Sequence, residues 1–224
     1  MADNVPNGAA ILLAFIRVTE TGRNDTSAYT TIYGHNEGRL PRPITSMTVD
    51  QIIAAGPGWT RAFKSSAAGA YQFMNATLKD LKLSLGLTGG EVFTPALQDR
   101  LGLALLKRRG FEGFMAGTIG RNAFGLGLAR EWASFPVLAD VKGAHRQVAR
   151  GETYYAGDKL NKALVKPDAV EAMLTEVKAG HVAPDQSGTT AAARPAPPCR
   201  AIFITIIILA ALAAAFFLST RVRF

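Results

Sequence analysis

The chain has 224 residues, 48% of them hydrophobic, and a formal net charge of +8. Its one cysteine, Cys199, excludes an internal disulfide, and its three scattered histidines give no metal-ligand spacing, so we expect no metal and no other cofactor. Residues 181–224 hold four arginines and one aspartate, a net +3, which leaves +5 on residues 1–180. This excess suits an anionic surface, but no basic stripe is interleaved with aromatic residues, so we expect no nucleic-acid partner.

The chain divides into three parts by composition. Residues 1–180 are predicted to form one globular domain, and residues 181–200, rich in Ala and Pro, predict an extended linker. Residues 201–220 contain no charged residue and are long enough to cross a bilayer, so we predict one transmembrane helix there. Residues 1–6 lack the basic start of a signal peptide, and the arginines on either side of 201–220 leave its orientation open.

Hydrophobic periodicity and end signals predict a mostly helical globular part. The expected helices cover residues 9–20, 48–55, 71–85, 94–109, 111–117, 121–133 and 167–180. The second of them is expected to begin at the N-cap Thr48 and to stop at Gly56. Residues 29–34 predict a short strand and turn because Tyr, Thr and Ile dominate them. The predicted fold class is therefore α+β and mostly helical.

Glu20 is the first candidate catalytic residue. It ends the most apolar helix-like segment of the globular part, and Thr21-Gly22 follows as a stop signal. The partial negative charge of a helix C-terminus disfavours a carboxylate, and partial burial disfavours it further, so both effects raise its pKa. A raised pKa is what a general acid needs near neutral pH. The alternative is an ordinary solvated glutamate at a helix end.

A second candidate feature is the small-residue turn at residues 66–73, with the sequence Ser-Ala-Ala-Gly-Ala-Tyr-Gln-Phe. Small residues such as Ser66 and Gly69 let the backbone approach a ligand closely. Tyr71 would offer a stacking face, and the amide of Gln72 both donates and accepts hydrogen bonds, as sugar hydroxyls require. The alternative is a flexible turn into a helix, with Tyr71 packed in the core.

Several short motifs occur in a fixed order along the chain: Glu20-Thr21-Gly22, Tyr33-Gly34, and residues 66–72, 93–100, 107–110 and 131–136. In this set the chain resembles the phage lambda-type endolysins, or phage muramidases, which have a lysozyme-like fold. The resemblance covers roughly residues 9–180. It implies that Glu20 is the catalytic acid and that the substrate-binding residues are Ser66, Gly69, Tyr71, Gln72, Tyr33 and Ser134. The stretch after Pro136 and the apolar tail depart from the family.

The number of catalytic carboxylates predicts the reaction. Most glycosidases use two, but the position at which the phage lysozyme branch places its aspartate is Tyr29 here. Asp25 and Glu37 are nearby acids, and Asp25 lies in a polar stretch typical of turns. One carboxylate suffices if the muramic acid C6 hydroxyl attacks its own C1. We therefore predict a lytic transglycosylase that cuts MurNAc-GlcNAc β-1,4 bonds and leaves a 1,6-anhydro product.

Other interpretations stay open from the sequence. The chain could be a hydrolytic muramidase, a non-catalytic membrane-anchored peptidoglycan-binding module, or a lysis protein that permeabilises the membrane through its tail. We expect a monomer that is anchored in the inner membrane and faces the periplasm when it acts, with cytoplasmic or virion-associated storage as alternatives. Of the two tryptophans, Trp132 fits an apolar helix pattern and is expected in the core, while Trp59 follows Gly56-Pro57-Gly58 and is the better candidate for a cleft rim.

Overall fold

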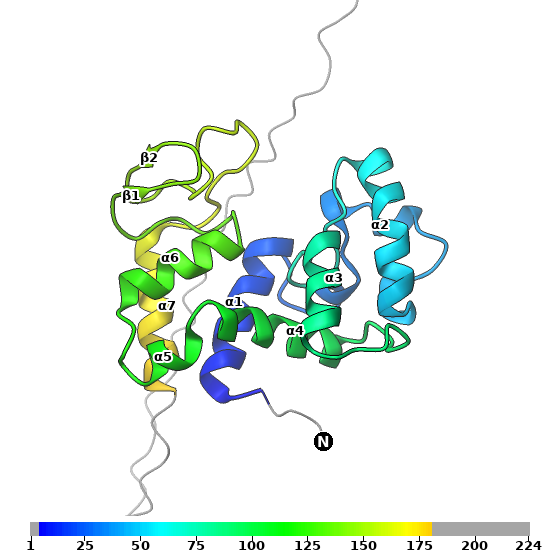
Figure 1. The fold of residues 1–224 in the computed structure, drawn as a ribbon, viewed down its shortest axis with the longest axis horizontal. Helices are drawn as coiled ribbons and strands as arrows, with labels where there is room; N and C mark the ends of the chain where they lie inside the picture. Colours follow the sequence, from blue (N-terminus) through cyan, green and yellow to red (C-terminus); the bar gives the residue numbers. More distant parts are fainter. Residues whose placement is uncertain (1–4, 181–224) are drawn as a thin grey trace, which may run out of the picture. The chain divides into compact units, whose positions relative to one another are not determined.

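The computed structural model describes residues 5–180, which form a mostly helical domain with one small sheet (Figure 1). The predicted α+β class is confirmed, and it is consistent with a lysozyme-like fold. The α-helices of this part are α1 (Asn7–Thr21), α2 (Val49–Phe63), α3 (Asn75–Ser84), α4 (Pro95–Arg108), α5 (Phe111–Met115), α6 (Arg121–Glu131) and α7 (Pro167–Ala179). Four 3-10 helices lie between α1 and α2: η1 (Thr26–Thr30), η2 (Tyr33–His35), η3 (Glu37–Arg39) and η4 (Ile44–Ser46).

Helices α1 and α4 lie between two groups of elements (Figure 1). Helices α2 and α3 lie on one side, and α5, α6, α7 and the sheet lie on the other. Helix α1 packs against both α7 and α4, which its nearly all-round apolar sequence permits. Gly102 in α4 makes close packing possible, because a Cβ there would lie 2.8 Å from the Leu13 side chain of α1. The buried core is therefore continuous around α1.

Helix α2 is longer than predicted. Thr48 caps it as expected, with its hydroxyl accepting from the Gln51 N–H in a capping box, but the helix passes through Gly56 and ends at Phe63. Pro57 cannot donate the helical hydrogen bond to the carbonyl of Ile53, and the side chain of Asn75 from α3 donates to that carbonyl instead, at 2.6 Å. A Cβ at Gly56 would lie 2.2 Å from the Asn75 amide nitrogen, so the glycine makes room for this contact and does not stop the helix.

Two further boundaries differ from the sequence prediction. Helix α3 begins at Asn75 and not at residue 71, because residues 68 and 73 pair across a tight turn. The strand predicted at residues 29–34 is wrong: this stretch carries parts of η1 and η2, and only Ile32 makes an isolated bridge, to Ala68. Its backbone bonds partly to short-range turns and partly to the turn at residues 66–73, where the Tyr33 N–H donates to the Ala67 carbonyl and the Thr31 carbonyl accepts from the Gly69 N–H.

The sheet was not predicted. Strands β1 (Val141–Lys142) and β2 (Gln147–Val148) pair antiparallel, with Val141 opposite Val148. Strands of two residues are too short to show an alternating pattern in sequence.

The remaining helix predictions agree with the structure to within a few residues. Helix α4 starts as expected, with the Thr94 hydroxyl accepting from the Leu97 N–H and Pro95 in the first turn. None of the helices within residues 5–180 is both long and apolar enough to cross a membrane. The predicted linker at 181–200 and the predicted transmembrane segment at 201–220 lie outside the described residues.

Candidate active site

Glu20 lies in the last turn of α1, and its side chain is half-buried. Gly22 follows in the left-handed conformation, with φ of 68°, and its N–H closes the helix on the carbonyl of Val18. The hydroxyl of Ser134 donates a hydrogen bond to Oε1 of Glu20. Burial raises the pKa of Glu20 to about 7, and the Ser134 hydrogen bond opposes that rise. A carboxyl group with this pKa is available in both protonation states near neutral pH, as acid-base catalysis requires.

Ser134 comes from a segment 114 residues further along the chain, and several contacts fix its position. The indole of Trp132 donates to the carbonyl of Tyr71 at 3.2 Å, and the Ser134 carbonyl accepts from the N–H of Leu164 at 2.7 Å. The ring of Phe135 meets Phe15 of α1 edge-on, with the ring centroids 5.9 Å apart. The predicted proximity of Ser134 to the acid is thus present in the structure, and Trp132 is buried as expected.

The turn at residues 66–73 is held by Gln98, a fully buried residue of α4 that the sequence prediction missed. The Gln98 amide accepts from the N–H of Ala70 at 2.9 Å and donates to the carbonyls of Tyr29 and Phe93, both at 3.0 Å. Gly69 has φ of 78°, and a Cβ there would lie 2.3 Å from Gln98 Oε1. Gly69 therefore leaves the room that Gln98 needs inside the turn. The only sequence signal for Gln98 was a polar residue on the apolar face of a strong helix.

Tyr71 does not offer a stacking face. Its side chain is 1% exposed, and its hydroxyl donates to Asp99 at 2.5 Å. Tyr29 donates to the same Asp99 oxygen at 2.9 Å, and Arg17 donates to the Tyr29 hydroxyl at 2.8 Å. Burial and the neighbouring Asp99 carboxylate raise the pKa of Tyr71, so its hydroxyl stays protonated. The expectation that Tyr71 lines the cleft is corrected: Tyr71 is a core residue that links α4 to the turn.

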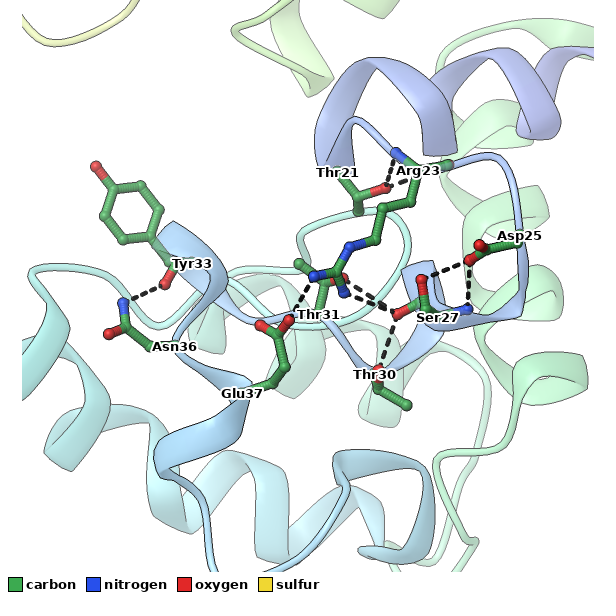
Figure 2. Close-up of polar contacts among 9 residues, drawn as sticks. All are labelled: Thr21, Arg23, Asp25, Ser27, Thr30, Thr31, Tyr33, Asn36 and Glu37. Atoms are coloured by element: carbon green, nitrogen blue, oxygen red, sulfur yellow. Dashed lines mark hydrogen bonds and ion pairs between the residues drawn. The ribbon is translucent and has the colours of Figure 1, made fainter. Parts of the chain in front are cut away.

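The other predicted substrate residues differ in whether their side chains have a group or face left for a ligand. Ser66 is buried, and its hydroxyl accepts from the Asn75 N–H at the start of α3. Gln72 has φ of 47°, and its side-chain amide donates to the carbonyl of Gly69 at 2.9 Å. Its amide oxygen has no such bond within the turn. Tyr33 is 48% exposed, and Figure 2 shows its ring pointing away from the neighbouring polar cluster. Of the predicted binding residues, Tyr33 therefore presents the largest accessible face.

A polar cluster directly follows Glu20 along the chain (Figure 2). Arg23 reaches from the end of α1 to the Glu37 carboxylate at 2.7 Å and to the Thr31 hydroxyl at 2.9 Å. Burial opposes ionisation of Glu37, but hydrogen bonds to its carboxylate and the Arg23 charge prevail, so its pKa is lowered. Glu37 is thus an ionised carboxylate held by a cation, which does not suit a proton donor.

The remaining nearby acid is also occupied. Asp25 caps η1, and one of its oxygens accepts from the N–H of Ser27 at 2.8 Å and from the Ser27 hydroxyl at 2.5 Å. This is the turn-forming role expected of it. Tyr29 stands at the position of the lysozyme-branch aspartate and is buried. Within residues 5–180, no group of three His, Cys, Asp or Glu side chains could hold a metal ion.

Comparison with known proteins gives the family of the chain. A family model described as Endolysin matches residues 11–157, which is more than half of the chain and includes Glu20, Gln98 and Ser134. The chain therefore belongs to the endolysin family, whose members are enzymes that degrade peptidoglycan in phage lysis. No curated protein matches the chain, and no solved structure does either. The substrate class is peptidoglycan, and the predicted assignment to a phage endolysin is confirmed at this level.

Proposed function

We propose that this endolysin is a lytic transglycosylase that cleaves the β-1,4 bond between MurNAc and GlcNAc, with Glu20 as its single acid and base. Protonated Glu20 donates its proton to the glycosidic oxygen as that oxygen leaves the muramic acid C1. The Glu20 carboxylate then accepts the proton of the C6 hydroxyl as the C6 oxygen bonds to C1. The products are a free hydroxyl on one fragment and a 1,6-anhydro ring on the other, and no water is consumed.

The observation that carries this proposal is that Glu20 has a raised pKa at the end of α1, while the two acids near it in sequence are engaged by other groups. The pKa of Glu20 is raised to about 7, so the group can both give and take a proton. The two other acids near it in sequence, Asp25 and Glu37, are engaged by Ser27 and by Arg23. A hydrolase of the two-carboxylate type needs a second free acid about 5–9.5 Å away, and Tyr29 holds the position at which the lysozyme branch has one.

The proposed substrate contacts are those that the structure leaves accessible. Tyr33 offers an exposed ring for stacking on a sugar. Gln72 offers its amide oxygen, and Ser134 holds the Glu20 carboxyl in place. Ser66, Gly69 and Tyr71 act indirectly, because they shape the turn that carries Gln72.

The test compares the muropeptides released from purified sacculi by the wild-type protein and by Glu20→Gln. The wild type should release fragments with anhydro ends, each one water lighter than the corresponding reducing fragment, and Glu20→Gln should release none. Reducing MurNAc ends from the wild type would show hydrolysis. Binding to sacculi without cleavage would support the non-catalytic wall-binding alternative.

We further propose that residues 201–220 anchor the enzyme in the inner membrane, with the catalytic domain in the periplasm when it acts. The support is the charge-free apolar composition of this segment and the Pro-rich stretch before it. Protease treatment of spheroplasts tests this directly, since an externally placed domain is digested and an internal one is protected.

A further inference from the structure

A pocket of about 320 Å³ lies between α2 and the segment that leads into it. Its walls are mainly apolar, and they include Leu40, Met47, Ala54, Ala55 and Trp59. We call it the Trp59 pocket. Trp59 is only 8% exposed, so the predicted cleft-rim position is replaced by a place in the pocket wall. The volume is at the lower end of the range for small-molecule sites, which suits a small side chain or a short peptide.

The Trp59 pocket carries one charge, the guanidinium of Arg42. Arg42 donates to the side-chain oxygen of Gln51 at 2.8 Å, and that oxygen also accepts from the N–H of Thr48 at 2.9 Å in the α2 capping box. The Gln51 side chain of the capping box therefore holds the Arg42 guanidinium in place. Among residues 5–180, no carboxylate forms an ion pair with Arg42, and one neutral hydrogen bond leaves most of its five N–H donors for a ligand.

An apolar pocket with one held arginine fits a ligand that has small apolar groups and a carboxylate. Peptidoglycan offers such a ligand beside its glycan, because its stem peptides combine alanine methyl groups with several carboxylates. We propose that the Trp59 pocket binds the stem peptide of peptidoglycan, with Arg42 contacting a peptide carboxylate. The inference rests on the proposed function, since it takes the substrate to be peptide-bearing peptidoglycan.

The chain itself offers another occupant, the Pro-rich stretch at residues 193–198. Arg194 and Arg200 lie within or beside that stretch, and it contains no acid. Electrostatic repulsion from Arg42 disfavours this segment, whereas attraction favours an acidic peptide. Charge complementarity therefore selects the stem peptide.

The pocket wall is connected to the catalytic end of α1. Arg23, three residues after Glu20, pairs with Glu37 at 2.7 Å, and Glu37 begins η3 (Figure 2). Leu40 follows η3 directly and is the first residue of the pocket wall. An ion pair thus joins the segment that lines the pocket to the segment that follows Glu20.

The experiment measures binding of the free stem tetrapeptide, L-Ala-γ-D-Glu-meso-diaminopimelate-D-Ala, to the full-length protein by calorimetry. Arg42→Gln removes the charge, Arg42→Lys keeps it, and Arg61→Gln removes another exposed arginine, which lies in α2 and does not line the pocket. We expect Arg42→Gln to weaken binding at least tenfold, Arg42→Lys to keep part of it, and Arg61→Gln to change it less than twofold. Amidation of the peptide carboxylates should reproduce the Arg42→Gln loss.

Three results would overturn the proposal. These are no binding of the tetrapeptide, equal effects of Arg42→Gln and Arg61→Gln, or tighter binding of either chitotetraose or a synthetic peptide of residues 193–198. Calorimetry reports binding without cleavage, so it separates the two proposals. A protein that binds the tetrapeptide but produces no anhydro ends would refute the transglycosylase function alone. A protein that produces anhydro ends but does not bind the tetrapeptide would refute the stem-peptide proposal alone.

Discussion

The replacement Glu20→Gln is expected to stabilise the protein at high pH, although it removes the proposed catalytic group. The pKa of Glu20 is about 7 in the folded protein, against an ordinary value of 4.5. Below pH 4.5 the carboxyl is protonated in both the folded and the unfolded chain. As the pH rises from 4.5 to 7, the unfolded chain ionises first, so the wild type loses stability. Above pH 7 both states are ionised and the loss is complete.

The magnitude follows from the pKa difference. One pKa unit corresponds to about 1.4 kcal/mol, so the rise from 4.5 to about 7 costs the wild type about 3 kcal/mol at pH 8. Glutamine does not ionise, so it has no such destabilisation, and its oxygen can accept the same Ser134 hydrogen bond. Its extra amide N–H groups lose roughly 1 kcal/mol if they are left without partners. Glu20→Gln should therefore be about 2 kcal/mol more stable than the wild type at pH 8 and slightly less stable at pH 4.

The assay is urea unfolding of both full-length proteins at several pH values, followed by the fluorescence of the buried Trp59 and Trp132. The difference between the two proteins in free energy of unfolding is the informative quantity, because the other titrating groups cancel in it. It should change by about 3 kcal/mol between pH 4 and pH 8. A difference that is constant over this range would refute the reasoning that burial raises the pKa of Glu20.

Three other replacements test the surroundings of the site. Ser134→Ala removes the hydrogen bond that lowers the pKa of Glu20, so the alkaline limb of kcat/KM should move to higher pH, and an unmoved limb would contradict this role. Gln98→Leu leaves three buried backbone groups without a hydrogen-bond partner, so it should lower the free energy of unfolding by about 3 kcal/mol or more. A loss below about 1 kcal/mol in chemical unfolding would contradict this role. Asn75→Ala leaves the Ile53 carbonyl without its donor and should cost about 1–2 kcal/mol by the same measurement, whereas no loss would show that another group satisfies it.

Local sequence signals predicted the parts of the structure that depend on local chemistry. Thr48 and the Thr94-Pro95 pair mark helix starts because a capping hydroxyl and an N1 proline act within one turn. Glu20 became a candidate because its position at the end of an apolar helix is visible in sequence, and the resemblance to the endolysins implied its catalytic role. The proximity of Ser134 to Glu20 was implied only by the resemblance to the endolysins, since 114 residues separate the two.

The errors arose where distant residues decide the local conformation. Gly56 and Pro57 are helix breakers by local rules, but Asn75 supplies the hydrogen bond that Pro57 cannot, so α2 continues. Tyr71 was placed in the cleft because its ring could stack on a sugar and because the resemblance to the endolysins implied that position. Its hydroxyl instead donates to Asp99, 28 residues later, and its ring is buried in the core. Such partners are defined only by the folded structure.

The origin of the oxygen at the newly formed chain ends tests the central claim most directly. Sacculi digested in water enriched in oxygen-18 distinguish the two reactions, because hydrolysis places a solvent oxygen on C1 and ring closure uses the C6 oxygen already present. We expect fragments from the wild-type protein to end in anhydro rings without label, and no fragments from Glu20→Gln. Labelled reducing ends from the wild-type protein would contradict the account.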